Sequence, residues 1–281
     1  MRFHNKTAIL KVIDNNDEQA AISKTTHLAI GAHQDDLEIM AYHGIATCYQ
    51  ADDKFFTGVT VTSGSGSIRN ESFQTLTEQE IVQRRNEEQL EAARVGKYNS
   101  IALLNYPSSA VKTIHSDIED DLYNILTLTT PDIIYTHNLA DKHTTHVGVA
   151  VQVINAIRRL PKNKRPREIY GCEVWRALDW MGKDKVKLDI SNYPQLSEHL
   201  LRVYTSQLES GKDYVNATIG RRIANATFDE THQSDRVKRA TYAMDLMPLV
   251  RGEKTSIKMF IQQYLKAFED DLMHIIDIYE K

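Results

Sequence analysis

The chain has 281 residues, of which 41% are hydrophobic and 26% are charged, and its formal net charge is −4. This composition is ordinary for a globular protein with a substantial core, and the negative charge excludes a general attraction to nucleic acid or anionic membranes. Two isolated cysteines, Cys48 and Cys172, do not suggest a disulfide framework and are interpreted as buried small residues.

The N-terminal residues lack the apolar stretch of a secretory signal, and no apolar run approaches the roughly 20 residues of a transmembrane helix. We therefore expect a cytoplasmic protein that does not enter the membrane.

Apolar runs alternate with amphipathic segments along most of the chain. After an N-terminal extension, residues 1–24, the patterns predict strands at 27–32, 55–62, 101–104, 132–136 and 168–175. Helices are predicted between them at 37–51, 77–95, 117–128 and 147–159. This alternation is typical of an α/β fold, a Rossmann-like parallel sheet with helices on both faces.

The pattern changes after about residue 180, which divides the prediction into a Rossmann-like core over 25–180 and a mainly helical C-terminal part over 181–281, packed on the core. Helices are predicted there at 195–208, 213–226 and 255–279, besides one short strand at 188–190. The last helix is amphipathic. A helix packed on its own chain is the favoured interpretation, and a dimer interface is the alternative.

Two segments were considered as a phosphate-binding loop and as a nucleic-acid site. The Gly/Ser-rich residues 63–70 lack the Lys-Ser/Thr of a phosphate-binding P-loop and are either a surface loop or a mobile flap over an active site. The basic residues 158–167 contain no aromatic side chain for base stacking, so an exposed loop is expected there rather than a nucleic-acid site. No glycine fingerprint of a dinucleotide site follows the first strand.

The first strand is followed directly by three side chains that can bind metal or transfer protons: His33, Asp35 and Asp36. Ligands of open α/β sheets bind at this carboxyl edge. His33 and Asp36 are three residues apart, so on a helical turn they share one side and suit zinc. Asp35 points elsewhere and is free to take a proton from a zinc-bound water. A catalytic zinc needs a third ligand, and the His-rich stretch 133–146 is the best source.

Three motifs carry a resemblance to a known family. Residues 32–38 read Ala-His-Gln-Asp-Asp-Leu-Glu, residues 143–146 read His-Thr-Thr-His, and Arg85-Asn86-Glu87-Glu88 opens a helix with an Ala-Ala…Gly ending. Together they resemble the PIG-L / LmbE-like family of zinc-dependent N-acetylglucosaminyl de-N-acetylases, whose first two motifs are Ala-His-Pro-Asp-Asp-x-Glu and His-Pro-Asp-His. The resemblance runs from about residue 25 to 245.

The resemblance implies a role for each matching residue. One zinc per chain is held by His33, Asp36 and His146. Asp35 is the general base, and His143 stabilises the oxyanion or protonates the leaving amine. The family match also favours Arg85 as a substrate-binding residue. From their positions after the strands, Asn138 and Asp141 are expected to hydrogen-bond substrate or to orient the site loop, and Trp175 either to belong to the core or to bind substrate as a wall that stacks on a sugar.

Two positions depart from the family pattern. Gln34 replaces a proline, which is expected to relax the turn without removing metal binding. Thr145 replaces an aspartate that supports the catalytic histidine, and a hydroxyl cannot raise the imidazole pKa as a carboxylate does. We expect Asp141 to support His143 instead.

The sequence thus predicts a zinc-dependent hydrolase that removes an acetyl group from an N-acetylglucosamine-type sugar or conjugate. Its partner is a small-molecule N-acetylated amino sugar, not nucleic acid or a membrane, and a homo-oligomer is left open. The alternative is a non-catalytic sugar- or metal-binding protein on the same fold, which the changed second motif favours.

Overall fold

The computed structural model describes residues 1–13, 17–66, 75–209, 211–252 and 255–280. In these ranges one mixed sheet has the strand order β1-β4-β3-β2-β5-β6-β8-β7. The strands are β1 (Ile9–Val12), β2 (His27–Gly31), β3 (Phe56–Thr62), β4 (Ser100–Tyr106), β5 (Ile133–His137), β6 (Glu168–Cys172), β7 (Val186–Asp189) and β8 (Ala240–Asp245).

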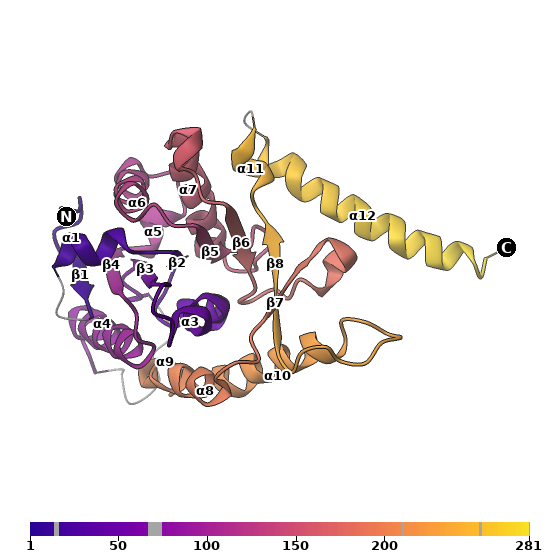
Figure 1. Ribbon diagram of the computed structural model, residues 1–281, viewed down its shortest axis with the longest axis horizontal. Coiled ribbons are helices and arrows are strands. Elements are labelled where there is room, and N and C mark those ends of the chain that lie inside the picture. Colours follow the sequence, from indigo (N-terminus) through magenta and orange to yellow (C-terminus); the bar gives the residue numbers. More distant parts are fainter. Residues whose placement is uncertain (14–16, 67–74, 210, 253–254, 281) are drawn as a thin grey trace.

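The centre of the sheet is parallel, from β4 through β3, β2 and β5 to β6. Every residue of β2, β3 and β4 is buried. Strands covered on both faces read as continuous apolar runs, which is why the sequence showed them so clearly. The predicted Rossmann-like parallel sheet with helices on both faces is confirmed (Figure 1).

Both edges of the sheet are antiparallel, and they come from outside the predicted core. β1, in the N-terminal extension, pairs with β4. β8 pairs with both β6 and β7, so the part after residue 180 adds two strands to the sheet as well as helices. β7 corresponds to the short strand predicted at 188–190. The sequence analysis missed β8, whose six residues lie far from the other strands in sequence.

Helices cover the two faces of the sheet (Figure 1). The larger apolar cluster lies under α6 and α7, and a second cluster lies under α2, α3, α4 and α8. The helices are α1 (Glu18–Ser23), α2 (Asp36–Met40), α3 (Tyr42–Cys48), α4 (Glu78–Val95), α5 (Ser108–Val111), α6 (Ser116–Thr129), α7 (Thr144–Arg159), α8 (Pro194–Arg202), α9 (Thr205–Leu208), α10 (Tyr214–Thr227), α11 (Pro248–Arg251) and α12 (Ile257–Asp277). The described residues also include the 3-10 helices η2 (Lys162–Lys164), between α7 and β6, and η3 (Asp179–Asp184), between β6 and β7.

Three helix predictions can be compared with the structure in detail. The helix predicted at 37–51 is divided at Ala41 into α2 and α3. The capping box of α4 is confirmed, with the Thr77 side chain and Glu80 bonded reciprocally. His115, not Ser116, occupies the N-cap of α6.

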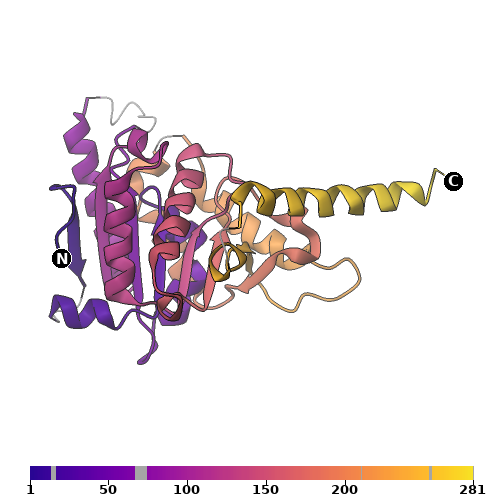
Figure 2. The same ribbon diagram turned by 90° about the horizontal axis from the view of Figure 1, so that it is seen from above.

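The last helix, α12, projects from the body of the molecule (Figures 1 and 2). Its first turns pack on the core through Phe260, and Phe268 meets Trp180 of η3 edge to face at 6.2 Å. Beyond this point its apolar side chains are exposed, including Leu272 and Ile275. The packed helix favoured from the sequence therefore describes only the first half of α12.

Within the described ranges, no helix combines the length and the apolar character required to cross a bilayer.

The first strand carries a buried histidine that should make folding sensitive to acid. Burial, followed by the charges of His43 and Lys54, lowers the pKa of His27 to about 4, against opposite effects of Asp132 and Glu168. Because the folded-state pKa lies below that of the unfolded chain, the stabilisation is present above pH 6.5 and is lost as the pH falls through about 4. Roughly 3 kcal/mol of unfolding free energy is at stake.

We expect His27→Gln to lose less stability than the wild type between pH 7 and pH 4, as measured by urea unfolding at a series of pH values. Parallel pH profiles for the two proteins would contradict this assignment.

Candidate metal and active site

The candidate site lies at the carboxyl edge of the parallel strands, where three strand ends meet. The loop after β2 supplies His33, Asp35 and Asp36, and the start of α7, after β5, supplies His143 and His146. Since β2 pairs directly with β5, these two loops are neighbours although they are more than 100 residues apart in sequence. The segment after β6 closes a third side, because β6 pairs with β5.

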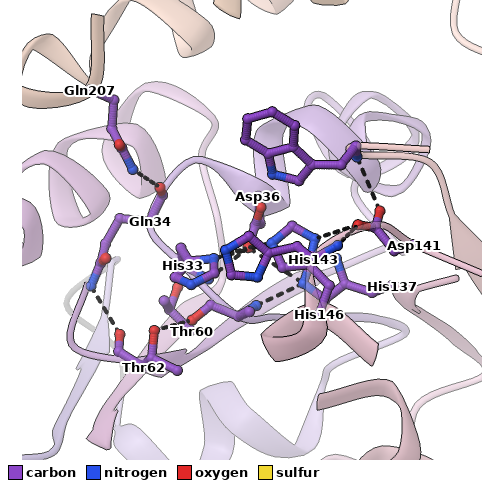
Figure 3. A network of polar contacts seen from close by, with 12 residues as sticks. His33, Gln34, Asp36, Thr60, Thr62, His137, Asp141, His143, His146 and Gln207 are labelled. Atoms are coloured by element: carbon purple, nitrogen blue, oxygen red, sulfur yellow. Dashed lines mark hydrogen bonds and ion pairs between the residues drawn. The ribbon is translucent and has the colours of Figure 1, made fainter. Parts of the chain in front are cut away.

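Three candidate ligand atoms converge on one point (Figure 3). His33 Nδ1 lies 3.2 Å from Asp36 Oδ2 and 3.1 Å from His146 Nε2. Asp36 Oδ2 lies 3.4 Å from His146 Nε2. Zinc bonds of about 2.0–2.1 Å in a tetrahedral arrangement separate neighbouring ligand atoms by about 3.3–3.4 Å. The spacing and the donor set of these three side chains therefore fit zinc.

The geometry also groups His137 with Asp36 and His146, and His143 with His33 and His146, as clusters able to hold a metal. His137 is fully buried, and its Nε2 lies 3.4 Å from Asp36 Oδ2. However, the backbone N–H of Ala32 donates to that same nitrogen at 2.8 Å. The lone pair of His137 Nε2 is therefore engaged, so this nitrogen is not available as a metal ligand.

The protonation states of the converging groups favour metal binding. Burial alone would raise the pKa of Asp36, but the His146 and His137 rings, with a hydrogen bond from His33, hold it well below its usual range. Burial lowers the pKa of His146 to about 4. A carboxylate and a neutral imidazole are the forms in which these side chains bind metals.

Asp35 lines the same cavity as His33 and Asp36. Its backbone is left-handed, with φ 96°, an uncommon conformation for a residue with a side chain. Such strain persists where the surroundings impose it, often at functional sites. Burial, and next the Asp36 carboxylate, raises the pKa of Asp35 well above its usual range, while Arg85 acts in the opposite direction.

Gln34 holds the strained turn in place. Its side chain is fully buried and donates to the carbonyl of Thr62 at 3.2 Å, and its own carbonyl accepts from Gln207 Nε2 at 3.0 Å (Figure 3). The replacement of proline by Gln34 was expected to relax this turn. The structure instead shows hydrogen bonds that restrain it from both sides.

Asp141 contacts both histidines of the second motif. Its Oδ1 accepts the backbone N–H of His143 at 2.8 Å and lies 3.5 Å from Nδ1 of His146. Its Oδ2 accepts the backbone N–H of Trp175 at 3.0 Å. With both oxygens engaged, Asp141 orients the ligand His146 and anchors the segment after β6, which argues against direct contact with substrate.

His143 stands at the mouth of the ligand cluster. Its ring meets His33 edge to face at 4.9 Å and stacks on His146 at 4.6 Å. Burial, and next the His33 ring, lowers the pKa of His143. The carboxylates of Asp36 and Asp141 act in the opposite direction. Thr145, at the position of the missing aspartate, is fully buried and lines the cavity, and its hydroxyl adds no charge.

Arg85 reaches the cavity from α4, where it is 3% exposed, and donates to Gln207 Oε1. Gly64 makes this approach possible. Its φ is +70°, and an added Cβ would lie 2.4 Å from Gln34 Oε1 and 2.8 Å from an Arg85 guanidinium nitrogen. Gly64 and Gly66 line the cavity, whereas residues 67–70 of the predicted flap lie outside the described part of the chain.

Of the two remaining substrate-binding predictions, one residue lines the cavity and the other does not. Trp175 lines the cavity. Asn138 is fully buried, donates to the carbonyl of Cys172 and accepts from the N–H of Ala140, so its side chain holds the loop and does not face the cavity. The sequence analysis missed Gln207, Lys212 and other lining residues from the C-terminal part, because no motif marks them.

The sequence and structure were compared with known proteins. The model of a family described as PIG-L, GlcNAc-PI de-N-acetylase, matches residues 28–157. This segment is a PIG-L domain. The resemblance inferred from the motifs is thus confirmed, and all three motifs lie inside the matched range. Among curated proteins, none matches the sequence.

Several solved structures resemble this chain over most of its length. The N,N'-diacetylchitobiose deacetylase of Pyrococcus horikoshii is 19% identical with a TM-score of 0.62, covering 84% of this chain and 88% of its own. The A40926 pseudoaglycone deacetylase is 16% identical with a TM-score of 0.57, covering 79% and 97%. The 4-carboxy-2-hydroxymuconate hydratase of Pseudomonas putida KT2440 is 15% identical with a TM-score of 0.63, covering 83% and 100%. At these identities the likeness establishes the fold and not the reaction.

The ligand geometry predicts about one zinc per chain, measured by elemental analysis after dialysis. The double variant His33→Ala/His146→Ala should lose it, because two of three ligand atoms are gone, whereas His199→Ala, an exposed histidine outside the site, should keep it. Zinc retained in the double variant at wild-type level would show that the metal binds elsewhere.

Asp141→Asn should weaken zinc binding by about 10- to 100-fold, since a carboxylate behind a histidine ligand fixes its ring and raises its basicity. Competition with a chelator measures the affinity, and Asp52→Asn, on the exposed surface, is the matched control. An unchanged zinc affinity together with a shifted pH profile of turnover would instead assign Asp141 to His143.

Proposed function

We propose that the protein is a zinc-dependent hydrolase that removes the acetyl group from an N-acetylglucosamine-type sugar or conjugate. The observation that carries the proposal is the 3.1–3.4 Å separation of the three candidate ligand atoms of His33, Asp36 and His146. The PIG-L match and the deacetylase relatives support the choice of reaction. A zinc ion bound there supplies a Lewis acid that polarises an amide carbonyl and lowers the pKa of water to about 7.

Asp35 is proposed to take the proton of the attacking water. It lines the cavity beside the ligand Asp36, on the turn that Gln34 and Gln207 hold in place. A general base must stay within hydrogen-bond reach of its proton, and a fixed backbone serves that need. Arg85, which lines the same cavity as Asp35, is proposed to bind substrate hydroxyls or oxyanions through its planar guanidinium.

His143 is proposed to stabilise the oxyanion that develops on the amide oxygen and then to protonate the departing amine. It lines the cavity beside the ligand cluster and is fixed by its backbone bond to Asp141. Its ring meets His33 edge to face, beside the candidate ligand atoms. Trp175, which also lines the cavity, is proposed to pack against a sugar ring.

The zinc-loaded protein should release acetate from at least one member of a panel of N-acetylated amino sugars. Asp35→Asn should lower kcat by about 10²- to 10⁴-fold, the usual contribution of a general base, while zinc content is unchanged. Asp52→Asn, an exposed carboxylate, is the control.

Wild-type turnover in zinc-loaded Asp35→Asn would refute the role of Asp35. Zinc and sugar binding without acetate release from any amide would favour the alternative, a non-catalytic sugar- or metal-binding protein.

A further inference from the structure

The last helix, α12, exposes an unusual share of the large apolar side chains of this protein. Nine of the fifteen large hydrophobic residues that are exposed in the described part of the chain lie between Met259 and Tyr279. Leu272 is 42% exposed and Tyr279 is 81% exposed. Single exposed apolar residues are normal, but their concentration on one helix that leaves the body of the molecule is typical of an interaction surface (Figure 2).

The apolar side chains of α12 follow the spacing of a helix that packs lengthwise against another helix. Intervals of four and three residues alternate along one row: Ile261, Leu265, Phe268, Leu272, Ile275 and Tyr279. This spacing keeps one face of a helix against a second helix whose side chains interlock with it. Ile261 already packs on the core of its own chain. The exposed stripe therefore begins at Leu265, ends at Tyr279 and has Leu272 at its middle.

The charges of α12 are separated along its length. Residues 255–268 contain Lys258 and Lys266 and no carboxylate, whereas residues 269–280 contain five carboxylates and no lysine or arginine. Amphipathic helices that lie on membranes carry lysine and arginine to attract anionic lipids, so the acidic distal half disfavours such a surface. The same charge disfavours nucleic acid. The partner of the exposed stripe is therefore expected to be a protein helix with cations near one end.

A second copy of α12 has this charge pattern when it runs in the opposite direction. An antiparallel pair centred near Leu272 brings Lys266 of each chain toward the partner's Asp277 and the partner's Glu280, both of which are exposed. Within its own helix Lys266 contacts Asp270, so it would lie between carboxylates of both chains. A parallel pair would instead place the five carboxylates of one chain beside the same five of the other. Complementary charges of this kind select the orientation of an interface.

We propose that α12 joins two copies of this chain, whose exposed stripes pack antiparallel about a two-fold axis near Leu272. In this pair Leu265 faces the partner's Tyr279, and Phe268 faces the partner's Ile275. The contact is the same for both chains, so the assembly closes as a dimer. The bodies lie at opposite ends of the helix pair, because each α12 projects from its own body (Figures 1 and 2). This inference is independent of the proposed function.

The size of the exposed stripe sets the expected affinity. It spans residues 265–279, which is about 22 Å of helix at 1.5 Å per residue. Its apolar surface is on the order of several hundred Å², below the roughly 800 Å² that each partner contributes to a standard interface. We therefore expect a dimer with a dissociation constant of micromolar order.

Sedimentation equilibrium of the full chain, from about 1 to 200 μM, should show a monomer–dimer equilibrium. Leu272→Gln/Ile275→Gln should raise the dissociation constant at least about tenfold, because neighbouring apolar layers of the pair are lost. Ile223→Gln/Phe228→Gln is the matched control, since it makes the same kind of change at exposed apolar residues outside α12 and should leave the dissociation constant unchanged. Near-ultraviolet circular dichroism checks that each variant keeps its packed core.

Wild-type protein that stays monomeric over this range, or a dimer of unchanged affinity in Leu272→Gln/Ile275→Gln, would overturn the proposal. Incubation with vesicles of neutral phosphatidylcholine tests the other occupant. A monomer that sediments with these vesicles, and loses that binding in the double variant, would assign the exposed stripe to a lipid surface instead.

Cysteine cross-linking tests the orientation, since the native Cys48 and Cys172 are both buried. In the antiparallel pair the two copies of residue 271 lie close to the axis, whereas the two copies of residue 280 are about 24 Å apart. With oxidised glutathione, Asp271→Cys should therefore form an interchain disulfide much faster than Glu280→Cys. Equal rates, or faster cross-linking of Glu280→Cys, would overturn the antiparallel arrangement.

Discussion

The site depends on the carboxylate of Asp36, because one oxygen of this side chain is the point where the strand-end loops meet. It accepts the backbone N–H of His33 at 2.6 Å and lies within 3.4 Å of the His137 and His146 rings. A buried carboxylate is costly unless it is paired, so the surrounding imidazoles are required by its burial as much as by metal binding. Its charge therefore couples the loop after β2 to the loop after β5.

Support for this centre comes from long-range contacts. Asp141 connects the ring of His146 to the backbone of Trp175, and Gln207 joins the turn at Gln34, 173 residues earlier in the chain, to Arg85. The C-terminal part therefore does more than cover the core. It adds β7 and β8 to the sheet, restrains the turn that carries Asp35, and supplies lining residues of the cavity.

Sequence patterns predicted the elements that obey local rules, and they failed where distant contacts decide. Buried parallel strands and the capping box at Thr77 were predictable, since continuous apolar runs and hydrogen bonds three residues apart are local features. The motifs were enough to nominate His33, Asp36 and His146. The sequence left open whether Asn138 and Asp141 bind substrate or orient the site loop, because nearness in sequence does not show which way a loop side chain turns. In the structure the Asn138 side chain is fully buried, and Asp141 lies against His146.

The sequence by itself determined the α/β class, the family resemblance and the identity of the side chains at the strand ends, because strand periodicity and motif spacing act over a few residues. Only the tertiary structure decided that three ligand atoms converge to within 3.4 Å, that the Nε2 of His137 is already engaged by a backbone amide, and that cations from α10 face the same cavity. Those relations depend on how β2, β5 and β6 pair and on where the chain returns after β8. Pairing is set by packing across the whole sheet, which no short stretch of sequence encodes.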